Sequence, residues 1–264
     1  MLAVFESLAL RAGGRIMEIF HSGCAVEQKD DASPVTEADR AAERIILEGL
    51  RSAFPDIPCV AEEEAAAGIL PGDLGSAFFL VDPLDGTKEF VKRNGDFTVN
   101  IALVRNGAPE IGVVYAPANG RFFSARPGRA ERLELDAENG ISRHAIQVRN
   151  RSRSLTVVAS RSHRTPETDD FIGKVDAAEI VSIGSSLKFC LLANGEADLY
   201  PRFGRTMEWD TAAGDAVLRA AGGLTTTLDG KPLAYGKRNQ ANDADFANPF
   251  FIARGGVDAS VLPA

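Results

Sequence analysis

The most informative stretch of the sequence reads Ala77-Phe78-Phe79-Leu80-Val81-Asp82-Pro83-Leu84-Asp85-Gly86-Thr87. Its first five residues are apolar and predict a buried strand that stops at Asp82-Pro83. Two carboxylates three residues apart at a strand end can converge on one point, and Mg²⁺ prefers such oxygen ligands. Asp82 could then bridge two ions, Asp85 could bind one of them, and the Leu84 carbonyl could serve the other. A simple turn capped by Asp remains the alternative for this stretch alone.

Gly86 and Thr87 are expected to open a short helix directly after the two aspartates. Free backbone N–H groups at the start of a helix attract phosphate. The Thr87 hydroxyl is also placed to hold an attacking water molecule. This part of the stretch therefore favours a phosphate ester as the substrate.

Two further acidic segments lie far from this stretch in the sequence. Glu62 and the two glutamates after it follow an expected strand at 59–61, and Asp210 falls in the first turn of an expected helix at about 209–221. Taken singly, an acidic run is usually solvated surface, and an Asp in the first turn of a helix is usually a partner of the helix dipole. Their occurrence together with the 82–87 stretch on one chain leaves a shared metal site open beside these ordinary readings.

The hydrophobic periodicity predicts an α/β chain with two parts. The first part should contain helices near residues 4–20 and 37–54, followed by an antiparallel meander of strands. The second part should alternate strands and helices in a layered α/β arrangement. We place the border in the polar stretch 149–154, which divides the chain into domains 1–152 and 153–264. The helix near residue 37 begins with a capping box made by Thr36 and Asp39. The expected strands and helices of the second part are 155–159, 166–174, 179–183, 185–193, 197–200 and 209–221.

The composition excludes several classes of protein. The chain has 264 residues and a formal net charge of −8, which argues against nucleic acid as the main partner. Three scattered cysteines match neither a zinc site nor a disulfide framework, so we expect a reducing, cytoplasmic location. The N-terminal segment is predicted to be an amphipathic helix rather than a signal peptide, and no apolar run is long enough to span a membrane. Peripheral association with a membrane surface stays open, as does the oligomeric state.

These motifs resemble the inositol monophosphatase superfamily, a group of lithium-sensitive phosphatases with a DPxDGT signature. Residues 82–87 match that signature at every fixed position, and Trp209-Asp210 with Ala213-Gly214 match the second signature. Within the superfamily the chain is most similar to the CysQ-type 3'(2'),5'-bisphosphate nucleotidases. The segments that support this similarity are 88–90, 94–100, 160–163, 184–189 and 200–202. One departure is Ala61, where a small hydroxyl residue or a glycine often precedes the glutamate pair.

The resemblance implies a fold and a set of residue roles. The fold is a layered αβαβα sandwich of the inositol monophosphatase and fructose-1,6-bisphosphatase type, with the site in the cleft between its halves. The implied ligands of two Mg²⁺ ions, with room for a third near the glutamate pair, are Glu62, Asp82, Leu84, Asp85 and Asp210. Glu62 also helps to activate water, and Thr87, held by Asp39, orients this nucleophile.

The implied reaction removes the 3'-phosphate of adenosine 3',5'-bisphosphate (PAP) to give AMP and phosphate, a step of sulfur metabolism. The sulfated analogue PAPS is a further candidate substrate. The substrate-binding residues are expected to be Glu62, Leu84, Asp85, Gly86, Thr87, Ser160, His163, Lys188, Arg202 and Asp210. Two alternatives remain open: an inositol or sugar phosphatase on the same metal site, and a non-catalytic protein that binds metal or nucleotide.

Overall fold

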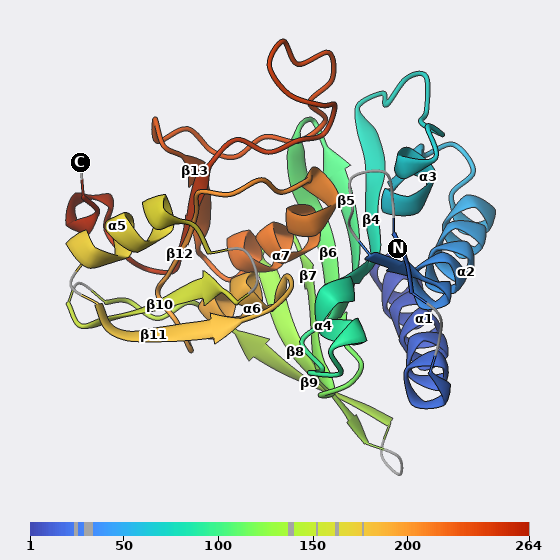
Figure 1. Ribbon diagram of the computed structural model, residues 1–264, viewed down its shortest axis with the longest axis horizontal. Helices are drawn as coiled ribbons and strands as arrows, with labels where there is room; N and C mark the ends of the chain where they lie inside the picture. The colour runs from blue at the N-terminus through green and yellow to red at the C-terminus, as the bar shows by residue number, and fades with distance from the viewer. Residues whose placement is uncertain are drawn as a thin grey trace.

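The computed structural model describes residues 1–23, 26–28, 34–136, 140–151, 153–161, 164–175 and 177–263. Five layers of secondary structure follow one another across the molecule (Figure 1). Helices α1 (Leu2–Ser22) and α2 (Glu37–Ala53) form the outer layer on a seven-stranded sheet. Helices α6 (Leu187–Ala193) and α7 (Glu208–Ala220) lie between this sheet and a five-stranded sheet, and α5 (Pro166–Lys174) covers the far face. The predicted αβαβα sandwich is therefore confirmed.

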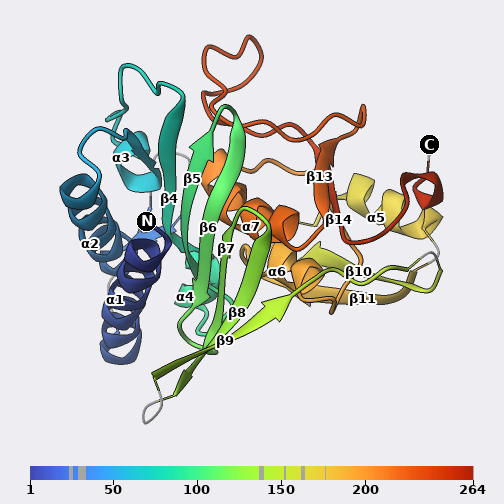
Figure 2. The same ribbon diagram turned by 180° about the vertical axis from the view of Figure 1, so that it is seen from behind.

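The seven-stranded sheet has the order β3-β4-β5-β6-β7-β8-β9, in which β3 runs parallel to β4 and each later pair is antiparallel. Its last two strands project as a long hairpin from the body of the molecule (Figure 2). Short helices α3 (Glu62–Ala66) and α4 (Thr87–Val91) follow β3 and β4. The strands are β3 (Cys59–Ala61), β4 (Ala77–Asp85), β5 (Thr98–Arg105), β6 (Ala108–Ala116), β7 (Arg121–Arg126), β8 (Arg129–Asp136) and β9 (Gly140–Ile146).

The five-stranded sheet has the order β11-β10-β12-β14-β13. Its first three strands are parallel, and β14 is antiparallel to both of its neighbours. The strands are β10 (Leu155–Ser160), β11 (Ala177–Ile183), β12 (Leu199–Arg202), β13 (Leu224–Thr227) and β14 (Phe251–Arg254). A separate ribbon pairs β1 (Val26–Gln28) with β2 (Pro34–Thr36), and η1 (Ala259–Val261) is a short 3-10 helix near the C-terminus.

Strand β4 does not stop at Asp82-Pro83, so that expectation was wrong. The strand continues to Asp85, and its register against β5 shifts between Asp82, which pairs with Asn100, and Asp85, which pairs with Thr98. This shift is a β-bulge with one extra residue on β4. A bulge tolerates proline because the missing N–H of Pro83 removes no ladder hydrogen bond there. The two aspartates therefore flank a bulge within the sheet.

Small residues bring α7 against the inner face of the seven-stranded sheet. A Cβ added at Gly112 on β6 would lie only 2.4 Å from the Ala213 carbonyl oxygen of α7. A Cβ added at Gly214 would lie 2.7 Å from the Phe189 ring of α6. This close approach carries the first turn of α7, with Asp210, toward the bulge on β4. None of the helices in the described part of the chain is long and apolar enough to cross a membrane.

Candidate active site

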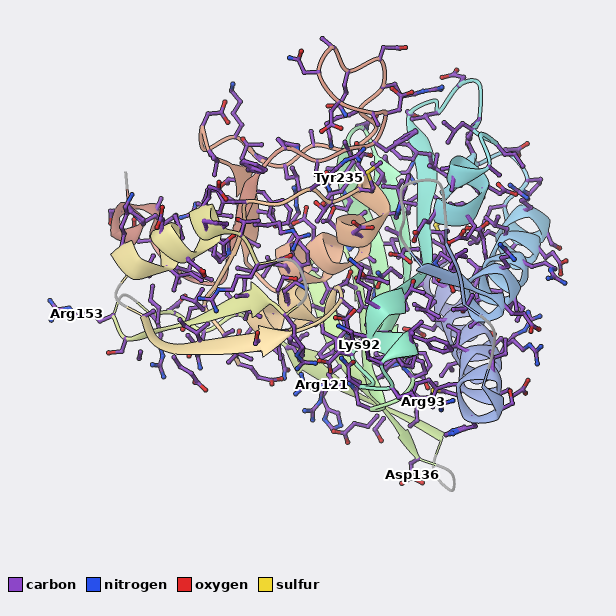
Figure 3. The ribbon with its side chains drawn as sticks, viewed as in Figure 1. Lys92, Arg93, Arg121, Asp136, Arg153 and Tyr235 are labelled. Carbon is purple, nitrogen blue, oxygen red and sulfur yellow. The ribbon has the colours of Figure 1, made fainter. Side chains whose placement is uncertain are left out.

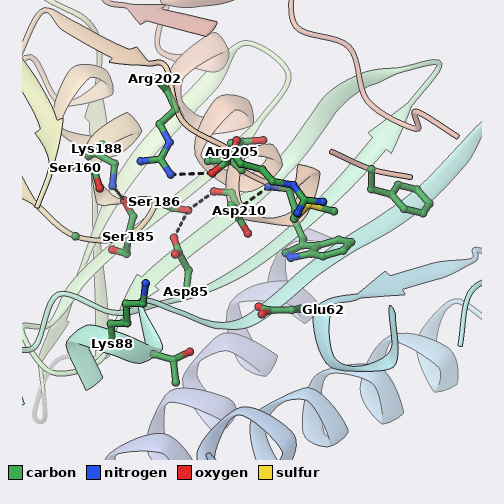
Figure 4. Close-up of a pocket in the computed structure, with 18 of the residues that line it drawn as sticks. Glu62, Asp85, Lys88, Ser160, Ser185, Ser186, Lys188, Arg202, Arg205 and Asp210 are labelled. Carbon is green, nitrogen blue, oxygen red and sulfur yellow. Dashed lines mark hydrogen bonds between the residues drawn. The ribbon is translucent and has the colours of Figure 1, made fainter. Parts of the chain in front are cut away.

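A cavity of about 600 Å³ opens between the bulge on β4, α3, the start of α6 and the first turn of α7. Eight residues that the sequence singled out line it (Figure 4). These residues are Glu62, Asp85, Gly86, Thr87, Ser160, Lys188, Arg202 and Asp210. Asp39, Asp82 and Leu84 are each about 1% exposed and do not line this cavity. His163 lies outside the described residues.

Asp82, Asp85 and Asp210 each have one carboxylate oxygen that accepts a hydrogen bond from the protein. Asp82 Oδ1 accepts from the Leu84 N–H at 3.0 Å, across the bulge. Asp85 Oδ2 accepts from the Ser186 hydroxyl at 2.8 Å, and Asp210 Oδ2 accepts from the Met207 N–H at 2.8 Å. A carboxylate has two oxygens, so each aspartate is oriented and can still offer an oxygen to a cation.

The carboxylates are close enough to alter one another's ionisation. Burial raises the pKa of Asp82 well above its ordinary value, and the charges of Glu62, Asp85 and Asp210 raise it further. The pKa of Asp210 is also raised well above its ordinary value, first by burial and then by Asp85 and Glu62. A hydrogen bond joins the carboxyl groups of Asp82 and Glu62. Asp210 therefore belongs to the same cluster as the bulge, although it lies far from Asp82 and Asp85 in the sequence.

The donor set suits a hard divalent cation. Carboxylate oxygens are the preferred ligands of Mg²⁺, and buried carboxylates without a cation repel one another and retain protons. Among the described residues, no three His, Cys, Asp or Glu side chains already surround one point in a finished coordination sphere. Because Glu62, Asp85 and Asp210 each raise the pKa of Asp82, these four carboxyl groups nevertheless lie within electrostatic range of one another.

Thr87 is held as the sequence led us to expect. Its hydroxyl lies 3.0 Å from Asp39 Oδ1 and 3.3 Å from the Leu84 carbonyl oxygen, and both atoms can accept from it. Asp39 Oδ2 accepts from the Thr36 backbone N–H at 2.8 Å and from the Thr36 hydroxyl at 2.7 Å. Asp39 thus completes the capping box of α2 and contacts Thr87 at the same time. The two roles expected for it are compatible.

Two buried cations lie on the other side of the aspartates from Glu62 (Figure 4). Lys188 is 5% exposed, and its ammonium group donates to the Ser185 carbonyl oxygen. Burial lowers the pKa of Lys188 to about 8, against the opposing effect of Asp85. The Arg202 guanidinium donates to the Gly204 carbonyl oxygen at 3.2 Å and to the Arg205 carbonyl oxygen at 2.9 Å. Both side chains are oriented by the backbone beside the cavity.

Sequence reasoning did not single out several residues that shape the cavity. Arg205 lines it with a side chain that is 61% exposed, and Lys88 lines it from α4. The start of α3 is held by Glu43 of α2, which accepts from the Glu63 N–H at 2.8 Å and the Glu64 N–H at 3.0 Å. These contacts depend on tertiary packing, and a lone Arg, Lys or Glu gives no local signal of them.

The loop segment between β13 and β14 also contributes to the cavity wall. It supplies Asp245 and Phe246 to the lining. Tyr235, labelled in Figure 3, donates its hydroxyl to Asp215 Oδ2 of α7 at 3.0 Å. Glu208, also buried on α7, accepts from the Gly236 N–H at 2.6 Å and the Lys237 N–H at 2.9 Å. Helix α7 therefore supplies Asp210 to the cavity and also fixes the neighbouring segment between β13 and β14 through hydrogen bonds.

Residues 1–253 match the profile of the Inositol monophosphatase family. The chain belongs to this family. It is 47% identical over 253 residues to the 3'(2'),5'-bisphosphate nucleotidase CysQ of Escherichia coli O157:H7, which covers 95% of this chain and 98% of that protein. It is 42% identical over 255 residues to the CysQ nucleotidase of Buchnera aphidicola, covering 96% of this chain and 93% of that protein.

Solved structures agree with the sequence comparisons. The crystal structure of CysQ from Bacteroides thetaiotaomicron superposes with a TM-score of 0.77 at 37% identity and covers 97% of both chains. The Thermotoga maritima IMPase superposes with a TM-score of 0.75 at 29% identity, covering 95% of this chain and 90% of that one. The family and the CysQ-type similarity inferred from the motifs are therefore confirmed.

We expect Mg²⁺ to stabilise the fold more at about pH 8 than at about pH 5. The folded chain without cation keeps protons on Asp82 and Asp210 at pH values where the unfolded chain has lost them. The free energy of unfolding therefore falls as pH rises through this range, and a bound cation that replaces the protons removes the loss. Thermal unfolding with saturating MgCl₂ and with EDTA at both pH values measures the difference. Equal shifts at the two pH values would contradict this account of the cluster.

Proposed function

We propose that this chain is a Mg²⁺-dependent phosphatase that removes the 3'-phosphate of PAP and releases AMP and phosphate. The observation that supports it best is that Glu62, Asp85 and Asp210, from distant parts of the chain, line one cavity, with Asp82 buried within electrostatic range of all three. Relatives named 3'(2'),5'-bisphosphate nucleotidase are similar to this chain in sequence over nearly its whole length. The reaction belongs to sulfur metabolism, and PAPS is a second candidate substrate of the same site.

The metal ligands proposed here are the four carboxylates and the Leu84 carbonyl oxygen. They would hold two Mg²⁺ ions, with a third, weaker ion near Glu62. Bound Mg²⁺ neutralises a phosphate dianion, makes water a better nucleophile and stabilises the leaving oxygen. A single carboxylate acting as general base contributes only about 10²–10⁴ in rate, which is too little for phosphate monoesters.

The remaining groups orient the reactants. Thr87, fixed by Asp39, presents its hydroxyl oxygen to the attacking water and restricts its direction of approach. Glu62 accepts the proton of this water as it attacks phosphorus. The backbone at Gly86 and Thr87 contacts the phosphate oxygens. Gly86 has φ of 100°, and a Cβ there would lie 3.0 Å from the Asp96 carbonyl oxygen, so only glycine fits this turn without strain.

The nucleoside and the uncleaved phosphate are assigned to the side of the cavity that holds Lys188. Lys188 and Arg202 supply positive charge, and charge-assisted hydrogen bonds of this kind are stronger than neutral ones. Ser160 lies beside Lys188 and suits a ribose or phosphate oxygen (Figure 4). Arg205 lines the same cavity with a more exposed side chain. His163 stays a proposed contact to the base or ribose.

The test is phosphate release from PAP with Mg²⁺, measured beside myo-inositol 1-phosphate under the same conditions. We expect PAP to be preferred, because only PAP places a second phosphate near Lys188 and Arg202. We also expect Li⁺ to inhibit and EDTA to abolish the reaction. A clear preference for myo-inositol 1-phosphate would replace this substrate assignment by an inositol phosphatase on the same metal site. A chain that binds Mg²⁺ but releases no phosphate would be a non-catalytic binding protein.

A further inference from the structure

The Ser186 hydroxyl lines the cavity between β4 and α7. It is within hydrogen-bond distance of Asp85 Oδ2, at 2.8 Å, and of the Asp210 carbonyl oxygen. Figure 4 shows Ser186 between these two aspartates. Asp85 ends strand β4, and Asp210 lies in the first turn of α7, so one side chain contacts two of the segments that supply acidic residues to the cavity.

Asn100 of β5 also contacts this hydroxyl. Its side-chain amide donates to Ser186 Oγ at 2.9 Å, and both residues are 2% exposed or less. A serine hydroxyl has one hydrogen and accepts through its lone pairs. Because Asn100 is the donor in this bond, the Ser186 hydrogen is directed to Asp85 or to the Asp210 carbonyl. A carboxylate is the stronger acceptor of the two.

Ser186 does not use its hydroxyl for an ordinary structural task. It occupies the N-cap position of α6, where serine usually accepts from a backbone N–H of the first turn. Here the Ser186 side chain makes no such capping hydrogen bond. The hydroxyl points toward the aspartates instead, so α6 has no side-chain cap from Ser186 and Asp85 has a hydrogen-bond donor.

We propose that Ser186, held by Asn100, is a positioning residue that aligns Asp85 and Asp210 for Mg²⁺ binding. This inference rests on the proposed function and adds to it two residues outside the expected ligand set. The bond to Oδ2 fixes the rotation of the Asp85 carboxylate and leaves Oδ1 for the cation. The contact to the Asp210 carbonyl keeps the start of α7 at a set distance from the bulge. Partners of this kind orient ligands and raise their basicity.

The experiment compares Mg²⁺ binding by isothermal titration calorimetry in the wild-type chain, Ser186→Ala and Ser186→Thr. We expect Ser186→Ala to weaken Mg²⁺ binding by about 10–100-fold, the range found when such partners of metal ligands are removed. Ser186→Thr keeps the hydroxyl and should restore most of the affinity. The Mg²⁺ concentration needed for half-maximal phosphate release should rise in parallel. Thermal unfolding in EDTA measures separately what the hydroxyl contributes to the fold, because its hydrogen bonds to Asn100 and Asp85 exist without a bound ion.

Ser124→Ala is the matched control. Ser124 on β7 is also fully buried, and its hydroxyl has no hydrogen-bond partner among the described residues. Its removal should leave Mg²⁺ affinity unchanged. Asn100→Leu, which keeps the size of the side chain and removes the donor to Ser186, should weaken Mg²⁺ binding in the same direction as Ser186→Ala.

Two outcomes would overturn the inference. Ser186→Ala with wild-type Mg²⁺ affinity would show that Asp85 and Asp210 need no such alignment. Equal losses in Ser186→Ala and Ser124→Ala would assign the effect to any lost buried hydroxyl. In both cases the wild-type chain still binds Mg²⁺ and hydrolyses PAP, so the proposed function survives. A wild-type chain that binds no Mg²⁺ would instead remove the proposed function and this inference together.

Discussion

Asp85→Asn is expected to lower Mg²⁺-dependent phosphate release from PAP by roughly 10³-fold. The substitution keeps the shape of the side chain and removes one negative charge from the proposed metal cluster. Stabilisation of the transition state by such ions amounts to several kcal/mol, and each 1.36 kcal/mol is a factor of ten in rate. Initial rates at saturating Mg²⁺, with phosphate detected directly, measure the loss.

Glu18→Gln is the matched control for this substitution. Glu18 is an exposed carboxylate on α1 that pairs with Arg15 on the same helix. Glu18→Gln removes one negative charge from a residue outside the cavity lining, so the variant should keep wild-type activity. If Asp85→Asn released phosphate at the rate of Glu18→Gln, the catalytic role given to the aspartates would be wrong, and the fold would be serving a purpose other than hydrolysis.

Arg149→Met is expected to destabilise the chain by about 3–5 kcal/mol. Arg149 lies in the segment that connects the two sheets and binds Asp198 through two hydrogen bonds of 2.8 Å. Asp198 is fully buried and also accepts from the Thr156 N–H at 2.7 Å. Removing the arginine leaves this carboxylate buried without its cation, and an unpaired buried charge is costly. Urea unfolding followed by circular dichroism measures the change in the free energy of unfolding.

Arg105→Met is the control for this ion pair. Arg105 pairs with Glu110 at 2.7 Å, and its side chain is 45% exposed. Solvent screens such a pair, so its loss should cost less than about 1 kcal/mol. The double variant Arg149→Met with Asp198→Asn should recover part of the stability, because neither partner then remains charged. Equal effects of Arg149→Met and Arg105→Met would mean that burial of Asp198 adds nothing to the pair.

The domain border at residues 149–154 has a physical counterpart in the structure, although the division itself remains a prediction. Strand β9 ends the seven-stranded sheet at Ile146, and β10 opens the five-stranded sheet at Leu155. The cavity draws residues from both sides of this border, and α6 and α7 pack between the sheets. The substrate would therefore bind where the two parts meet, which is a common position for ligand sites.

The sequence determined those features whose physical cause is local. The helix at 166–174 begins with proline and a threonine cap, and the structure places α5 at the same residues. Thr36 and Asp39 form the predicted capping box because both partners lie within one turn. Asp82 and Asp85 both lie at the end of β4, as expected for two residues so close in the sequence. Strands β13 and β14 were not predicted, because four residues carry too little periodicity, and β9 was missed because its exposed residues show no buried face.

Only the tertiary structure decided how the distant parts of the site meet. The bulge in β4 comes from its register against β5, and no residue of β4 specifies that register alone. Ser186 contacts Asp85 across 101 residues and Asn100 across 86, so these hydrogen bonds exist only after the start of α6 has packed against β4 and β5. The sequence around a serine or an asparagine does not reveal which distant residue its side chain will contact in the folded chain. Periodicity therefore predicts most of the elements, the family resemblance implies the proposed ligands, and packing decides which side chains contact them.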